Sequence, residues 1–112
     1  MMRPEFIPIL DADQLQDNAM HAFEHEGRRL LLVKAEGDFF VIDEMCSHED
    51  YSLALGCIQG KRIKCSLHGS YFDLASGEPD EDPADEPIHS YAVEVAEGKV
   101  WFNPTTPRQT AG

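Results

Sequence analysis

Two Cys/His pairs in the middle of the chain decide how the sequence is interpreted. Residues 46–48 read Cys-Ser-His and residues 65–68 read Cys-Ser-Leu-His, which gives C-x-H and C-x2-H spacing. The surrounding stretch from about 44 to 74 has no long apolar run and is typical of loops built around a ligand. Thiolate sulfur and imidazole nitrogen are donors for both Zn²⁺ and iron–sulfur clusters. On ligand type alone, both kinds of site stay open.

The order of the donors separates these two possibilities. Zinc modules more often pair Cys with Cys and His with His, whereas each pair here combines one Cys with one His. In one class of [2Fe–2S] centre, two cysteines hold one iron and two histidines hold the other. The spacing therefore favours an iron–sulfur cluster, with a structural zinc site as the alternative.

The segments on both sides of this region have the pattern of antiparallel strands. β-Branched and aromatic residues alternate with polar ones, and Glu-Gly or Gly turns separate the runs. Pro8 is tolerated only in an edge strand. Asp11 or Asp13 is expected to cap a short turn or helix. The tail from Asn103 is expected to fray. The expected strands are 6–10, 21–26, 28–35, 39–42, 91–95 and 99–102. This pattern predicts an all-β fold, an antiparallel sandwich or partly open barrel with a ligand-bearing insertion.

Length and composition restrict the class of protein further. The 112 residues predict a single domain, 1–112. The net charge of −12 argues against nucleic acid and anionic lipid as partners, because both need Lys and Arg. The sequence has no apolar stretch long enough for a membrane span or a signal peptide, so we expect a cytoplasmic protein. In a reducing compartment, three cysteines are better explained as metal ligands or free thiols than as disulfides.

Further positions around the pairs identify a family. From about residue 28 to 102 the chain resembles the Rieske ferredoxins. The matching positions are Leu53, Gly56, Gly60, Ile63, Gly69, Phe72-Asp73-Leu74, Gly77, Pro83-Ala84, Pro87-Ile88, Tyr91, Val93, Val95, Gly98 and Val100. A zinc site would give no reason for this run of residues.

The resemblance implies a fold and a ligand set. A β-sandwich or partly open barrel would form the base, and a small cluster-binding subdomain would cover about residues 44–75. Cys46 and Cys65 would hold the inner iron, and His48 and His68 the outer iron through their δ nitrogens. One [2Fe–2S] cluster per chain is implied.

The chain also departs from other members of the family. Quinol-oxidising relatives join two extra cysteines in a disulfide at the positions of Tyr51 and Leu67, so that bridge is absent. Cys57 has no matching partner and is expected to be a buried free thiol. Ser70 stands where high-potential relatives place a hydroxyl that tunes the cluster, but Phe72 replaces their Tyr. We therefore expect a low-to-intermediate potential within the family range.

The function implied by the resemblance is one-electron transfer. The chain would carry electrons from a flavin-containing NAD(P)H-dependent ferredoxin reductase to the terminal oxygenase of a ring-hydroxylating dioxygenase system in aromatic hydrocarbon catabolism. It would not itself be an enzyme, and it would act as a monomer through transient docking. The acidic segment 78–87 is expected to be an exposed loop, and His89 to be structural or exposed. The alternatives are a Rieske small subunit of a larger oxidoreductase such as nitrite reductase, and a zinc-stabilised interaction domain.

Overall fold

The computed structural model describes residues 5–45, 52–65, 71–79 and 87–107. These residues form strands and two single-turn 3-10 helices. In chain order the elements are β1 (Ile7–Asp11), η1 (Ala12–Gln14), β2 (Ala19–His25), β3 (Arg28–Ala35), β4 (Asp38–Asp43), η2 (Leu53–Leu55), β5 (Cys57–Gln59), β6 (Arg62–Lys64), β7 (Tyr71–Asp73), β8 (Ser90–Ala96) and β9 (Lys99–Pro107). The predicted all-β class is confirmed, and no helix in the described part of the chain could cross a membrane.

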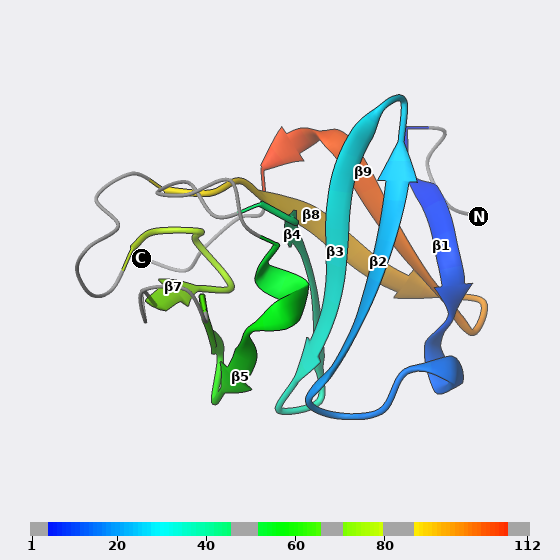
Figure 1. Cartoon of the computed structure of the whole chain (residues 1–112). Coiled ribbons are helices and arrows are strands. Elements are labelled where there is room, and N and C mark those ends of the chain that lie inside the picture. The colour runs from blue at the N-terminus through cyan, green and yellow to red at the C-terminus, as the bar shows by residue number, and fades with distance from the viewer. Residues whose placement is uncertain (1–4, 46–51, 66–70, 80–86, 108–112) are drawn as a thin grey trace.

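A six-stranded antiparallel sheet forms the base of the molecule. Its strand order is β1-β9-β8-β4-β3-β2. The sheet curls (Figure 1), and residues of both edge strands, β1 and β2, line one small pocket. This arrangement confirms the expected partly open barrel. Pro8 lies in an edge strand as predicted, because β1 pairs only with β9 within this sheet.

Short Glu-Gly turns set the register of the hairpins. Between β2 and β3, Glu26 and Gly27 have φ angles of 50° and 79°, and the turns at 36–37 and 97–98 repeat this pattern. Two successive residues with positive φ match the right-handed twist of the flanking strands. The predicted hairpins are therefore confirmed. At η1, the Gln14 side chain accepts a hydrogen bond from the Asp11 backbone N–H at 3.2 Å, so Asp11 is the capping position.

The aliphatic run Leu30–Val33 is buried on both faces of the sheet. Each of its four side chains is at most 1% exposed. Because side chains alternate along a strand, Leu31 and Val33 face one core while Leu30 and Leu32 face another. We call the first the interface core; it comprises Leu31, Val33, Ala35, Phe40, Ile42, Leu53, Ile63, Cys65, Phe72, Leu74 and Ile88. The second, the barrel core, comprises Leu15, Leu30, Leu32, Val41, Tyr91, Val100 and Phe102.

A small sheet, β5-β6-β7, packs against the interface core. Figure 1 shows it beside the large sheet, with the coil of η2 between them. Ile58, Ile63 and Phe72 lie opposite one another in the register and contribute to the interface core. The expectation that Cys57 is buried is wrong, because Ile58 takes the inward position and its neighbour Cys57 is exposed.

Strand β9 is longer than the sequence suggests. The expected fraying from Asn103 is wrong for residues 103–107, which continue the strand. Asn103 is buried, and its side-chain oxygen accepts hydrogen bonds from the Thr105 backbone N–H and hydroxyl at 3.0 and 2.9 Å. A register irregularity between Tyr91 and Ala92 accommodates this extension.

Candidate metal centre

The second Cys/His pair begins at the end of β6. Cys65 follows Lys64 directly, is 1% exposed, and is a free thiol packed in the interface core. The pairing of Lys64 with Tyr71 is the last in the β6–β7 register before this connection. Residues 65–70 therefore connect two hydrogen-bonded strands, and His68 and Ser70 in this connection lie outside the described residues. Cys65 is the one predicted ligand that the structure describes.

The first Cys/His pair lies in a segment whose two flanking residues are also paired through their backbones. Residues 46–51, with Cys46 and His48, lie outside the described residues, but both ends of the segment are described. Met45 and Ser52 form an antiparallel bridge, and the Leu53 N–H donates to the Glu44 carbonyl at 2.7 Å. Both predicted ligand segments therefore start and end at paired backbone.

The ends of the two segments lie close together. A Cβ on Gly56 would lie 1.8 Å from the Lys64 carbonyl oxygen, so the chain after η2 runs directly against the residue before Cys65. Leu53 and Cys65 also belong to the same core. This close approach requires glycine at position 56. The donor set predicted from the sequence, two sulfurs and two imidazoles, fits a [2Fe–2S] centre at this place.

A buried carboxylate holds the start of the first segment. The Arg29 Nε and Nη2 donate to the two Glu44 carboxylate oxygens at 3.2 and 2.9 Å, and the Ser52 hydroxyl donates to Glu44 Oε2 at 2.5 Å. The Glu44 side chain is 6% exposed, against 60% for Arg29. Arg29, Glu44 and Ser52 form what we call the Glu44 network.

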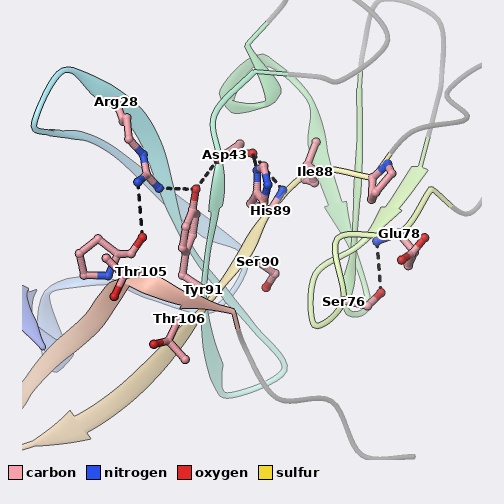
Figure 2. A pocket seen from close by; sticks show the side chains of 12 residues that line it. Arg28, Asp43, Ser76, Glu78, Ile88, His89, Ser90, Tyr91, Thr105 and Thr106 are labelled. Carbon is pink, nitrogen blue, oxygen red and sulfur yellow. Dashed lines mark hydrogen bonds and ion pairs between the residues drawn. The ribbon is translucent and has the colours of Figure 1, made fainter. Parts of the chain in front are cut away.

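The neighbouring residue, Asp43, forms a second network. Its Oδ2 accepts from the His89 backbone N–H at 2.9 Å and lies 2.8 Å from His89 Nδ1, and its Oδ1 accepts from the Tyr91 hydroxyl at 2.8 Å. Arg28 Nη2 donates to the same hydroxyl at 2.5 Å. Figure 2 shows these four residues, the Asp43 network, at a cleft of about 680 Å³. The expectation that His89 is structural or exposed is confirmed. Its ring contacts Asp43, and its side chain is 80% exposed.

Burial and the Asp43 carboxylate raise the pKa of Tyr91 to about 12, although the Arg28 guanidinium acts in the opposite direction. The Tyr91 hydroxyl therefore keeps its proton at neutral pH and continues to donate to Asp43. This donor fixes the end of β4 from the side of β8.

Sequence reasoning missed both networks. The signal that could have found them is the pair of charged dipeptides, Arg28-Arg29 and Asp43-Glu44, at strand ends that a hairpin brings together. The assignment of Cys46, His48, Cys65 and His68 as ligands stays a prediction. The expected exposure of the acidic segment 78–87 stays untested for residues 80–86, which lie outside the described part.

Comparison with known proteins gives consistent relatives. Residues 5–92 match the family model of the Rieske [2Fe-2S] domain. The chain is 30% identical over 101 residues to the ferredoxin CarAc of Metapseudomonas resinovorans, covering 89% of this chain and 94% of that one. It is 31% identical over 78 residues to the ferredoxin component of the naphthalene 1,2-dioxygenase system of Pseudomonas putida, covering 70% and 75%.

A solved structure agrees with these sequence relatives. The ferredoxin of carbazole 1,9a-dioxygenase from Nocardioides aromaticivorans IC177 superposes with a TM-score of 0.84 at 26% identity, covering 89% of this chain and 98% of that chain. The cofactor that follows from the family is a [2Fe–2S] cluster. The chain belongs to the Rieske [2Fe-2S] family.

Proposed function

We propose that Cys46 and Cys65 hold the inner iron of the cluster, and that His48 and His68 hold the outer iron. The burial of Cys65 supports this assignment, because a sulfur ligand kept away from water suits the inner position. The closed ends of segments 46–51 and 65–70 support it too. In this proposal, residues 1–112 form one domain with a cluster-binding subdomain of about 44–75.

The function that this site supports best is one-electron transfer. The bound cluster supplies reversible one-electron reduction and oxidation. The ends of both ligand segments lie at paired backbone, and such anchoring suits a site that must rearrange little on electron transfer. The observation that carries the proposal is the buried free thiol of Cys65 at the closed end of its hairpin, in a chain of this family.

The partners we propose are a ferredoxin reductase and a terminal oxygenase. Relatives of similar length are named as ferredoxin components of dioxygenase systems, which supports the same role for this chain. Its net charge of −12 would steer it toward basic surfaces, and short-lived docking suits an electron carrier. We further propose that it is a cytoplasmic monomer without catalytic activity of its own. The alternative role as a subunit of a larger oxidoreductase predicts a stable complex instead.

An EPR spectrum of the anaerobically purified, dithionite-reduced protein tests this proposal. We expect a rhombic signal with an average g value below that of the free electron, typical of mixed Cys/His ligation. His68→Ala should abolish that signal. A colourless wild-type protein with stoichiometric zinc would contradict the proposed function, and co-purification in a stable oxidoreductase complex would favour the alternative.

A second experiment tests the direction of electron flow. Stopped-flow absorbance should show reduction of the wild-type protein by NADH only when a ferredoxin reductase is present. Reoxidation should accelerate when a terminal ring-hydroxylating oxygenase is added. Reduction by NADH without any reductase would argue against a simple carrier.

A further inference from the structure

We infer that Glu44 is a positioning residue for the first ligand segment, acting through Arg29 and Ser52. The inference rests on the proposed function, since it takes Cys46 and His48 as ligands. Glu44 stands two positions before Cys46, and Ser52 stands directly after the segment 46–51. The Glu44 network therefore joins the two ends of the segment.

The two ends are held by backbone and by side chains. The backbone contacts are the Met45–Ser52 bridge and the hydrogen bond from the Leu53 N–H to the Glu44 carbonyl. The side-chain contact is the 2.5 Å hydrogen bond from the Ser52 hydroxyl to Glu44 Oε2. The same hydroxyl accepts from the Ala54 N–H at 3.2 Å and so caps η2. Ser52 thereby links the closure of the segment to the helical turn that follows it.

The buried charge of Glu44 fixes the orientation of the side chains around it. A carboxylate that is 6% exposed must have its oxygens satisfied, because an unpaired buried charge is strongly unfavourable. The guanidinium of Arg29 meets both oxygens, and such two-point contacts fix orientation as well as distance. Arg29 lies in β3, and its backbone carbonyl accepts a hydrogen bond from the Glu44 N–H at 3.2 Å. The Glu44 network thus ties the start of the segment to the first residues of β3 in the large sheet.

The Asp43 network provides a matched comparison on the same strand end. Asp43 precedes Glu44, but its carboxylate contacts His89 and Tyr91 on the side of β8, whereas the Glu44 carboxylate contacts Ser52. Removing the Tyr91 hydroxyl should therefore weaken the fold without loosening the closure of segment 46–51. Removing the Ser52 hydroxyl should do both.

The consequence for the cluster is a change in its retention and in its spectrum. When the two ends of a segment are held together less firmly, they separate more often. Iron bound through that segment is then exposed to chelators more often. Ligands that sit less firmly also change the anisotropy of the EPR signal. Neither effect requires a change in the identity of a ligand.

The test compares Glu44→Gln, Ser52→Ala and Ser52→Thr with wild type and Tyr91→Phe, all as cluster-loaded proteins. The rate of cluster loss is followed by visible absorbance in excess iron chelator, and EPR g values are recorded after reduction. We expect Glu44→Gln and Ser52→Ala to lose the cluster on the order of 10-fold faster, as for a buried polar group left without its partner. Both should show altered g anisotropy. Ser52→Thr keeps the hydroxyl and should restore the wild-type rate and spectrum.

Tyr91→Phe supplies the control for global stability, measured by urea unfolding. It should lower the unfolding midpoint to a similar extent as Ser52→Ala, yet change the rate of cluster loss by no more than about twofold and leave the g values unchanged. If Tyr91→Phe and Ser52→Ala accelerated cluster loss equally, the inference would be overturned. The Glu44 network would then contribute only to global stability. Should Glu44→Gln fail to fold, the Ser52→Ala and Ser52→Thr pair decides alone.

The outcome also separates the inference from the proposed function. A wild-type protein without the mixed-ligand EPR signal would contradict both. A normal wild-type signal, with wild-type rates and g values in Glu44→Gln and Ser52→Ala, would contradict the inference alone.

Discussion

The two sheets of this protein are stabilised in different ways. In the large sheet, the central strands β3 and β4 are covered on both faces, and Leu30–Val33 are essentially inaccessible to water. In the small sheet, the strands have three residues each, and only the face with Ile63 and Phe72 is buried. Strands this short do not form a stable sheet by themselves.

This difference indicates a division of roles. The large sheet has a core of its own, the barrel core, and among the described residues none of its members comes from β5, β6 or β7. The small sheet packs on the interface core, and in the proposed function the connection between β6 and β7 supplies two of the cluster ligands. We therefore expect the cluster to stabilise β5, β6 and β7 more than the large sheet, because a ligand stabilises the parts that must be folded to bind it.

Loss of the cluster should have the largest effect. Cys65→Ser removes a proposed ligand, so we expect a protein without the cluster signal. Hydrogen exchange at the amides of β6 and β7 should accelerate by at least about tenfold, while exchange in β3 and β4 changes little. Wild-type protein stripped of iron by a chelator is the control and should behave in the same way. Equal acceleration in both sheets would contradict the comparison.

Leu32→Ala should destabilise the whole protein whether or not the cluster is bound. Leu32 is fully buried in the barrel core, and a cavity of this kind costs about 2–5 kcal/mol in the free energy of unfolding. Urea unfolding of the cluster-loaded and cluster-free proteins measures this cost. A cost that appears only with the cluster bound would show that the large sheet is not independent of it.

Gly56→Ala should affect mainly the small sheet. The added Cβ would lie 1.8 Å from the Lys64 carbonyl oxygen, and backbone on both sides leaves little room to adjust. We expect a cost of about 1–3 kcal/mol, together with weaker cluster retention. Cys57→Ala, at an exposed position of β5 directly after Gly56, is the control and should change neither quantity measurably.

Tyr91→Phe should cost about 1 kcal/mol at neutral pH, because the hydrogen bond to Asp43 is lost. The pKa of Tyr91 is raised from 10.0 to about 12 in the folded state. The contribution of the hydroxyl is therefore complete below pH 10 and is lost as the pH rises through about 12. Stability curves of both proteins from pH 7 to higher values should converge in that window. A difference that grows with pH would contradict the assignment.

Asp38→Asn should have the smallest effect. Asp38 in β4 and Lys61 in the turn between β5 and β6 form an ion pair of 2.9 Å between the two sheets, and both side chains are about half exposed. Exposed pairs contribute about 0–1 kcal/mol, and less at high salt. Urea unfolding at low and high salt measures the effect. A larger loss would mean that this contact helps to hold the small sheet in place.

The strands and the family followed from local sequence. Alternating side chains and Glu-Gly turns predicted the hairpins, and the Cys/His pairs with the glycines around them predicted the family. The prediction failed at Cys57, where only the register of β5 decides which side chain faces inward. It also failed at residues 103–107, where the burial of Asn103 extends a strand that propensity alone would have ended.

The Glu44 and Asp43 networks could not be obtained from the sequence. Arg29 and Glu44 are 15 residues apart along the chain, Asp43 and His89 are 46 apart, and Arg28 and Tyr91 are 63 apart. Many acidic residues could have paired with these arginines in a chain that has 21 of them. Burial selects the partners, since a carboxylate removed from water requires donors in fixed positions.

The sequence by itself therefore determined the strand pattern and the family, because each depends on residues close together in the chain. The tertiary structure alone decided that Leu30–Val33 separate two cores, that Cys57 faces outward while Cys65 is buried, and that Glu44 contacts Ser52 at the two ends of segment 46–51. The physical reason is that burial and pairing depend on which distant segments pack together, and local patterns do not contain that information.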